Sequence, residues 1–128
     1  MKNKFIILGS GSSLGVPRID GNFGNCDPKN PKNIRTRCCA FFKFNNLNFL
    51  IDTSPDLRFQ LISNNIKDVN YVFYTHAHAD QCHGINDLRA FYIKYKKKLN
   101  VYADNTTKKH LLNTFSYCFK NKPGYPAM

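Results

Sequence analysis

The chain has 128 residues, enough for one domain around one hydrophobic core, and its 42% share of hydrophobic residues argues against a disordered protein. No run is long and apolar enough to span a bilayer, so we expect no membrane partner. The net charge of +11 is compatible with nucleic-acid binding, although 14 of the 19 basic residues are lysines, which A·T-rich codons also favour.

The cysteines indicate a reducing compartment. Their number, five, is odd, and their spacing fits neither a disulfide framework nor a Cys-x-x-Cys zinc site. The apolar run at residues 5–8 is too short for a secretory signal. We therefore expect a cytoplasmic protein with free thiols, formed by a single domain over residues 1–128.

The first quarter of the chain combines one strand with long irregular segments. Residues 4–8 predict a strand. Residues 9–17 form a Gly/Ser loop that lacks the Gly-Lys-Ser/Thr ending of a phosphate-binding loop, so we interpret it as a tight connector whose small residues let another loop approach. Residues 19–33 are rich in Gly, Asn and Pro without periodicity, and an irregular segment of that length is usually functional or mobile.

A hairpin is predicted next. Residues 38–44 and 47–51 have the composition of strands, and only Asn45 and Asn46 separate them. Asparagine tolerates positive φ, which a two-residue hairpin turn requires.

A helix is expected from residue 56 to about residue 64, with Ser54 as its N-cap and Pro55 as its first helical residue. Its apolar face is predicted at Leu57, Leu61 and Ile62.

The remaining chain alternates strands and helices. Residues 69–74 and 99–103 predict strands, residues 86–97 predict a helix, and Asn105 is expected to cap a last helix that reaches Phe115.

A histidine-rich motif follows the strand predicted at residues 69–74. His76 and His78 are two residues apart, which in an extended chain places both imidazoles on the same side. Asp80 adds a carboxylate within reach. Two nitrogens and one carboxylate in an open site suit catalytic zinc or a similar divalent ion such as manganese.

Five stretches of the sequence match one known family in their order and at similar spacing, between residues 4 and 89. They are residues 9–18, 26–28 together with 33–37, 50–58, 75–80 and 83–89. In these stretches the chain resembles the metallo-β-lactamase-fold hydrolases, within the branch of the phosphonate-pathway cyclic phosphodiesterase and, more distantly, the tRNA 3′-processing endonuclease. The resemblance implies an α/β fold, with a mixed β-sheet and flanking helices, that forms the N-terminal half of an αβ/βα sandwich.

The resemblance also implies roles for single residues. His76 and His78 would bind a first metal ion, and Asp80 would bind a second ion or orient the attacking water. Asp52, at a strand end, would support the motif loop by accepting hydrogen bonds. The implied reaction is hydrolysis of a phosphodiester or other ester by water that one or two zinc ions activate.

The sequence departs from the family pattern directly after Asp80. Gln81 stands where the family usually has a histidine, and an amide oxygen is a weak zinc ligand compared with an imidazole. His83 could replace it only by bending the turn. Cys82 could join the metal as a soft ligand, but we expect it to pack away from the site because free cysteines are usually buried.

The second departure is one of length, because the family's later half brings further metal ligands. The chain alone offers His76, His78 and Asp80. We therefore expect a truncated domain that needs a second polypeptide or self-association to become a hydrolase. A non-catalytic relic and a basic nucleic-acid-binding module stay as alternatives. Some strand residues should face the absent half, and the candidates are Phe41, Phe49, Ile51, Val72 and Tyr74.

The arginines at the end of the long loop are expected to form salt bridges. Arg35 and Arg37 could pair with Asp27 or Asp52, or with a substrate phosphate. We favour the structural pairing.

Overall fold

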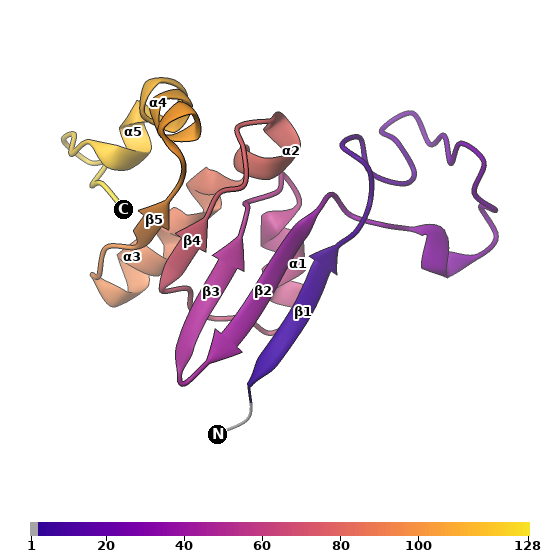
Figure 1. Cartoon of the computed structure of the whole chain (residues 1–128), viewed down its shortest axis with the longest axis horizontal. Coiled ribbons are helices and arrows are strands. Elements are labelled where there is room, and N and C mark those ends of the chain that lie inside the picture. Colours follow the sequence, from indigo (N-terminus) through magenta and orange to yellow (C-terminus); the bar gives the residue numbers. More distant parts are fainter. Residues whose placement is uncertain (1–2) are drawn as a thin grey trace.

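The computed structural model describes residues 3–128, which form a mixed five-stranded β-sheet with helices packed behind it (Figure 1). The strands lie side by side in chain order: β1 Lys4–Gly9, β2 Cys39–Phe44, β3 Leu47–Ile51, β4 Tyr71–Phe73 and β5 Asn100–Tyr102. Pairing is antiparallel from β1 to β3 and parallel from β3 to β5. The predicted α/β class with a mixed sheet and flanking helices is confirmed.

The helices are short. They are η1 Pro31–Asn33, α1 Leu57–Ser63, α2 Ala79–Cys82, η2 Ile85–Leu88, α3 Arg89–Tyr95, α4 Asn105–Thr114 and α5 Ser116–Phe119, of which η1 and η2 are 3₁₀ helices. None of the helices within residues 3–128 has the length and apolar character that crossing a bilayer requires.

The predicted hairpin is confirmed. Asn45 and Asn46 connect β2 to β3 with φ values of 46° and 68°. Both angles lie in the left-handed region that a type I′ turn needs at its two central positions. The turn fixes the register in which Phe44 pairs with Leu47.

One face of the sheet carries the core. Neighbouring strands contribute one row of paired residues to this face: Ile6, Phe41, Leu50, Val72 and Val101. Leu50 and Val72 are fully buried, and Leu57 of α1 and Leu111 of α4 belong to the same cluster. The helices thus cover the face of the sheet to which this row points.

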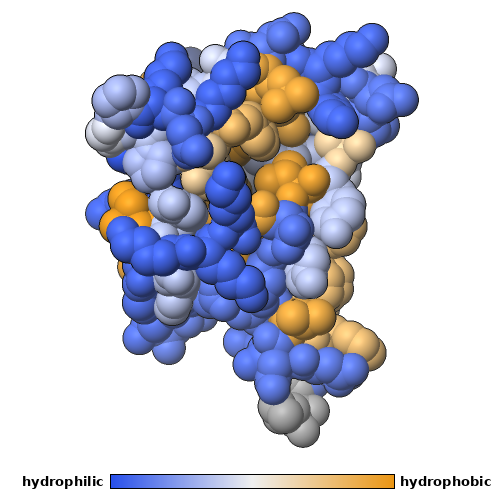
Figure 2. Space-filling view, turned by 90° about the vertical axis from the view of Figure 1, so that its left-hand side faces the viewer, coloured by the Kyte–Doolittle hydropathy of each residue, from blue (hydrophilic) through white to orange (hydrophobic). Residues whose placement is uncertain are grey.

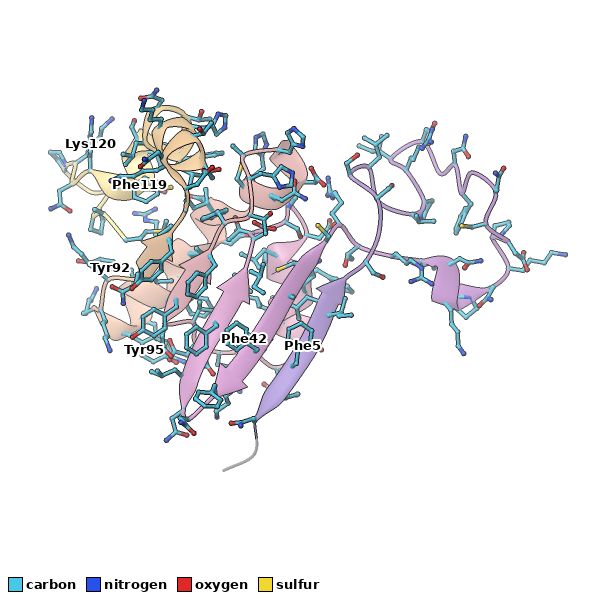
Figure 3. All side chains as sticks on the ribbon, viewed as in Figure 1. Phe5, Phe42, Tyr92, Tyr95, Phe119 and Lys120 are labelled. Carbon is cyan, nitrogen blue, oxygen red and sulfur yellow. The ribbon has the colours of Figure 1, made fainter. Side chains whose placement is uncertain are left out.

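The opposite face of the sheet is not covered. Phe5 and Ile7 of β1 are 64% and 67% exposed, and aromatic side chains continue across the next strands (Figure 3). The rings of Phe42 and Phe49 stack with their centroids 4.4 Å apart. The open face, as we name this surface, consists of Phe5, Ile7, Phe42, Phe49, Ile51, Tyr71, Phe73 and Tyr102.

The prediction of which strand residues face away from the core was therefore correct in part. Phe49 and Ile51 lie on the open face. Phe41, Val72 and Tyr74 are buried in the core instead.

A second apolar surface lies at the β5 edge. Figure 2 views this side and shows hydrophobic residues in a hollow between hydrophilic stretches. The hollow is lined by Leu99, Val101, Tyr102, Ala103, Lys108, Leu111, Leu112, Phe119 and Met128.

The Gly/Ser segment is the tight connector that was predicted. Gly11 N–H donates to the carbonyl of Thr36 at 2.7 Å, and Val16 and Arg35 exchange backbone hydrogen bonds. Between these contacts the chain forms an irregular excursion that projects beyond the β1 side of the sheet (Figure 1). The two ends of the excursion are therefore held together just beyond the carboxyl end of β1.

Several predicted helix ends were wrong. α1 begins at Leu57 and its N-cap residue is Asp56, not Ser54, although Ser54 Oγ accepts a hydrogen bond from Asp56 N–H. Its buried residues are Leu57, Gln60 and Leu61, whereas Ile62 is 65% exposed. Ile62 lies five residues after Leu57, so it is not on the face that the i, i+3 and i+4 positions share.

The later elements differ in similar ways. The helix predicted at residues 86–97 is divided into η2 and α3, and it ends where Lys96 adopts a φ of 54°. Asp104, not Asn105, caps α4, because its carboxylate accepts from Thr107 N–H at 2.8 Å. The strand predicted at residues 69–74 is only three residues long, and α2 and α5 were not predicted.

Candidate functional site

The site is built at the carboxyl ends of two parallel strands. β3 ends at Ile51 and β4 at Phe73, and these residues are paired in the sheet. Asp52 follows β3 and donates its N–H to the carbonyl of Phe73 at 2.8 Å. The loop that carries the two histidines follows β4. The carboxyl ends of parallel strands in open α/β sheets are the usual position of ligand sites.

Asp52 anchors the histidine loop. Its carboxylate accepts from the backbone N–H of Thr75 at 2.8 Å and from the hydroxyl of Thr75 at 2.7 Å. Asp52 is buried and has a φ of 62°, so its side chain is directed by backbone geometry that few non-glycine residues adopt. Burial raises the pKa of the Asp52 carboxyl, and the hydrogen bonds from Thr75 oppose that shift. The supporting role predicted for Asp52 thus has a geometric basis.

Thr75 in turn orients the ring of His76. Because the Thr75 hydroxyl donates to Asp52, its oxygen is free to accept a hydrogen bond from His76 Nδ1–H, 3.0 Å away. This chain of contacts leaves the lone pair of His76 on Nε2. Orientation of a ligand histidine through its other ring nitrogen is a general feature of metal sites.

His76 and His78 converge on one point. His76 Nε2 and His78 Nδ1 are 3.1 Å apart, and the two exposed rings meet edge to face. Two nitrogen ligands on a tetrahedral zinc ion, with bonds of about 2.0–2.1 Å, are separated by about 3.3 Å. The observed separation therefore suits two ligands of one divalent ion.

Asp80 lies on the first turn of α2, where Gln81 holds it. Gln81 Nε2 donates to Asp80 Oδ2 at 2.9 Å and to Sγ of Cys38, the residue before β2, at 3.2 Å. No hydrogen bond or salt bridge joins Asp80 to His76 or His78. Cys38 is a residue of the site region that the sequence did not indicate, because it lies 43 positions before Gln81.

The backbone of α2 is fixed against the segment that follows Asp52. Thr53 N–H donates to the carbonyl of Gln81 at 2.6 Å, and Gly84 N–H donates to the carbonyl of Thr53 at 3.0 Å. The Thr53 hydroxyl also contacts the Tyr74 hydroxyl at 2.8 Å. Burial raises the pKa of Tyr74, which therefore stays protonated as a structural hydrogen-bonding group.

The two other candidates beside the motif point elsewhere. Cys82 is fully buried and its thiol donates to the carbonyl of Ala77, so the prediction that it packs away is confirmed. His83 is exposed and its ring meets Phe115 edge to face. His110 contacts the same ring and the hydroxyl of Thr114.

Arg37, one of the two arginines predicted to form salt bridges, pairs with a carboxylate that was not among the predicted partners. Arg37 forms a two-pronged salt bridge with Asp56, at 2.9 Å from Nε and 2.8 Å from Nη2, and not with Asp27 or Asp52. Arg37 N–H donates to the same carboxylate at 2.9 Å. These hydrogen bonds hold the pKa of Asp56 below its ordinary value. Arg35 donates to the hydroxyl of Ser10.

Within residues 3–128, His76 and His78 form a pair of metal ligands and not a complete metal site. No three side chains of His, Cys, Asp or Glu in this part of the chain are close enough together to hold a metal ion. The fit to a divalent metal therefore depends on the oriented nitrogens of His76 and His78.

Sequence comparison places most of the chain in a known family. The family model described as beta-lactamase superfamily domain matches residues 47–128. A protein of Porphyromonas gingivalis (strain ATCC BAA-308 / W83) named octanoyltransferase is 34% identical over 123 residues, which are 95% of this chain but 24% of that protein.

Solved structures agree on the fold. A new diphosphatase from the PhnP family is 32% identical with a TM-score of 0.81, over 93% of this chain and 48% of that one. Zn²⁺-bound PqqB from Methylobacterium extorquens is 20% identical with a TM-score of 0.64, over 90% and 40% of the two chains. The short form of human tRNase Z is 16% identical with a TM-score of 0.65, over 94% and 42%. The chain thus spans about half the length of the diphosphatase and about a quarter of the curated relative.

Proposed function

The chain belongs to the beta-lactamase superfamily, and from this we propose that it carries the His-x-His half of a metal-dependent hydrolase that cleaves phosphodiester or related ester bonds. The observation that supports the proposal most is the convergence of His76 Nε2 and His78 Nδ1 at 3.1 Å. Zinc is the ion we propose, with manganese as the alternative.

The residues of the chain have distinct roles in this proposal. Asp52 and Thr75 hold His76 in the tautomer whose Nε2 faces the ion, and His78 supplies the second nitrogen. When bound, a divalent ion supplies Lewis acidity and lowers the pKa of water from 15.7 to about 7. Asp80, whose carboxylate is half-buried beside this position, either orients the attacking water or contributes to a second ion.

A second structural half completes the site in this proposal. A catalytic zinc site generally needs three protein ligands, and the histidine pair provides two. The open face supports the proposal, because a sheet with helices on only one side leaves aromatic surface that another layer could bury. The diphosphatase, about twice as long, is one precedent for such a larger fold. The complementary half could lie in a longer form of the same chain, in a second polypeptide or in a second copy.

The substrate class rests on charge and on relatives. A diphosphatase and a tRNase are among the similar structures, and a net charge of +11 favours anionic substrates. The same charge supports a second candidate function, binding of nucleic acid without turnover. The similar octanoyltransferase has about three quarters of its length outside the matched region, so we do not propose octanoyl transfer for this chain. The proposal places the protein in the cytoplasm, because all five cysteines are free thiols.

Calorimetric titration with Zn²⁺ and with Mn²⁺ tests the metal site. We expect the wild-type chain to bind zinc weakly, and the His76→Ala/His78→Ala variant to lose that binding. His110→Ala is the matched control, because His110 lies on α4 and is expected to leave binding unchanged. Equal metal uptake by the wild type and the double variant would contradict the assignment.

Activity requires a separate measurement. Hydrolysis of a chromogenic phosphodiester is assayed with the chain alone and with an added polypeptide that carries the later half of the diphosphatase fold. Turnover only in the mixture supports the proposed hydrolase. Absence of turnover in both, with zinc bound, favours the non-catalytic alternative. Metal-independent and steeply salt-dependent binding to RNA favours the nucleic-acid module.

A further inference from the structure

A cavity of about 320 Å³ opens at the amino-terminal ends of the three parallel strands. Leu47, Tyr71 and Asn100, the first residues of β3, β4 and β5, all line it. The histidine loop follows the other end of β4, and a strand of five residues such as β3 spans about 16 Å. The cavity is therefore separate from the candidate metal site, and its volume lies within the range of small-ligand sites in proteins.

Two lysines without carboxylate partners lie at this cavity. Lys97 and Lys98 line it, both are exposed, and neither forms a salt bridge within residues 3–128. Their position follows from the end of α3. Lys96 closes that helix with a φ of 54°, and its N–H donates to the carbonyl of Tyr92 at 2.8 Å, so the chain turns there before it enters β5. Two adjacent unpaired ammonium groups beside a cavity favour an anionic ligand such as a phosphate.

Three aromatic rings also line the cavity, those of Tyr71, Phe91 and Tyr95. The Tyr95 hydroxyl donates to the carbonyl of Lys67 at 2.8 Å, which ties the ring at the end of α3 to the segment before β4 (Figure 3). Tyr71 stacks on Phe49 with the ring centroids 5.0 Å apart, and Phe91 packs against the core cluster. The rings are thus held in place before any ligand binds, and rings of this kind are surfaces on which nucleobases stack.

One carboxylate, that of Asp68, lines the same cavity. Asn70 holds it, because the Asn70 amide accepts from the N–H of Asn48 at 2.8 Å and donates through Nδ2 to Asp68 Oδ2 at 3.3 Å. A carboxylate has about four acceptor positions, so Asp68 retains positions for a ligand. It repels a phosphate but accepts a hydrogen bond from an amino group. The cavity therefore suits a ligand that carries both an anion and an N–H donor, and not a simple anion.

We propose that this cavity binds a nucleotide whose base carries an exocyclic amino group. The phosphate pairs with Lys97 and Lys98, the base rests on the aromatic rings, and the amino group donates to Asp68. A free nucleotide and one nucleotide of an RNA strand offer the same groups, so both are sources of this ligand chemistry. The inference goes beyond the proposed hydrolase and does not depend on it, since the histidine loop lies at the opposite end of β4.

Calorimetric titration of the full chain with cytidine 5′-monophosphate tests the site, with a chelator present so that the histidine pair holds no metal. Uridine 5′-monophosphate is the matched ligand, because its base has a carbonyl oxygen in place of the amino group. We expect cytidine monophosphate to bind about tenfold more tightly than uridine monophosphate, and inorganic phosphate to bind more weakly than either. Equal affinities of the two nucleotides, or of cytidine monophosphate and phosphate, would overturn the proposal.

Variants assign the binding to named side chains. Lys97→Gln/Lys98→Gln should weaken the binding of cytidine monophosphate about tenfold or more. Lys108→Gln/Lys109→Gln, which removes two exposed charges from α4, is the matched control and should leave the affinity unchanged. Asp68→Asn should abolish the preference for cytidine over uridine monophosphate, a ratio that a general loss of stability does not alter. Equal effects of the two lysine pairs, or a preference that persists in Asp68→Asn, would contradict the proposal.

An oligocytidylate of five nucleotides distinguishes the two sources of the ligand. Affinity at least about tenfold higher than that of the mononucleotide identifies an RNA strand, and equal affinity identifies a free nucleotide. Oligonucleotide binding that Lys97→Gln/Lys98→Gln retains in full would overturn the site. The His76→Ala/His78→Ala variant should bind cytidine monophosphate like the wild type, so this site and the proposed metal site can fail independently.

Discussion

The α-carbon of Gly84 lies against the carbonyl oxygen of Ser54 so closely that a β-carbon at position 84 would overlap that oxygen. The same hypothetical β-carbon would lie 3.0 Å from Leu57 Cβ. Gly84 therefore allows the end of the histidine motif to pack directly on the segment between β3 and α1. This contact, together with the hydrogen bonds of Thr53, sets the position of α2 relative to the site.

Gly84→Ala should destabilise the protein by about 3 kcal/mol, because backbone atoms of two segments must move apart to accommodate one methyl group. The free energy of unfolding is measured by urea titration. Gly24→Ala is the control, since Gly24 has positive φ but no atom within 4 Å of the added β-carbon. It should cost about 1–2 kcal/mol, for backbone strain alone. Equal losses in the two variants would contradict the packing role of Gly84.

Thr75→Val should weaken zinc binding about 10- to 100-fold, because it removes the hydroxyl that orients His76 through Asp52. Valine keeps the shape of threonine, so the backbone hydrogen bond from residue 75 to Asp52 should persist. Calorimetry measures the affinity. Thr106→Val, on the exposed side of α4, is the matched control and should have no effect. Wild-type affinity in Thr75→Val would show that the hydroxyl does not orient the ligand.

The salt bridge of Arg37 and Asp56 should make stability depend on pH in a defined direction. The pKa of Asp56 is lowered mainly by the hydrogen bond from Arg37. Its stabilising contribution is therefore complete above the ordinary carboxyl pKa of about 3.9 and is lost as the pH falls through the lower pKa of the folded state. At pH 7, Asp56→Asn should cost about 1 kcal/mol in the free energy of unfolding. The difference from the wild type should narrow below pH 4, and a difference that stays constant with pH would contradict the assignment.

Arg37→Lys tests the geometry of the same salt bridge. Lysine keeps the charge but cannot make two parallel hydrogen bonds to one carboxylate, so the melting temperature should fall. A variant with wild-type melting but poorer binding of inorganic phosphate would favour a role in substrate binding instead.

Local rules were sufficient to predict much of this fold. The Asn45-Asn46 turn, the strand before the histidines and the spacing of His76 and His78 each depend on neighbours in sequence, and the structure contains all three. The N-cap predicted at Ser54 was wrong, because the helix begins only after Asp56, and the Ser54 hydroxyl donates to Gln60 Oε1 while it accepts from Asp56 N–H. A sequence pattern cannot indicate which of two polar partners a hydroxyl will prefer.

The missed features of the site depend on contacts between distant segments. Cys38 meets Gln81 only because β2 pairs with β3, and because Thr53 after β3 binds the backbone of α2. Likewise, Arg37 faces Asp56 and not Asp52, because Asp52 turns toward Thr75. In both cases the partner is selected by the register of the sheet, which no local pattern encodes.

Gln81→His should raise the metal content of the reconstituted complex, because it places an imidazole beside Asp80 in a position where an amide now stands. Metal content is measured by elemental analysis of the chain with the complementary half. The matched control is Gln60→His, since Gln60 is equally buried but bonds to Thr36 and the carbonyl of Arg37. An unchanged metal content in Gln81→His would mean that residue 81 does not limit the second ion.

Self-association of the isolated chain should increase with protein concentration, because the open face leaves stacked aromatic rings in contact with water. Exposed apolar surface of this kind marks a partner site or an aggregation hazard. A small domain also has a low free energy of unfolding, because it buries a smaller fraction of its surface than a large one. Helices do not relieve this exposure, since the helices that share the buried core pack behind the sheet. Sedimentation at several protein concentrations measures the association, and hydrogen exchange on the same samples shows which strands it protects.

A pair of matched substitutions assigns the association to one face. Phe5→Lys adds a charge on the open face, and Phe59→Lys adds the same charge on α1, where the original ring is 65% exposed against 64% for Phe5. Since the two rings are exposed to almost the same extent, any difference between the variants reflects where they lie and not how much surface they lose. We expect Phe5→Lys to reduce association and Phe59→Lys to leave it unchanged. A compact monomer with protected strands at low concentration would refute the prediction, because it would require the open face to be stable in water without a covering layer.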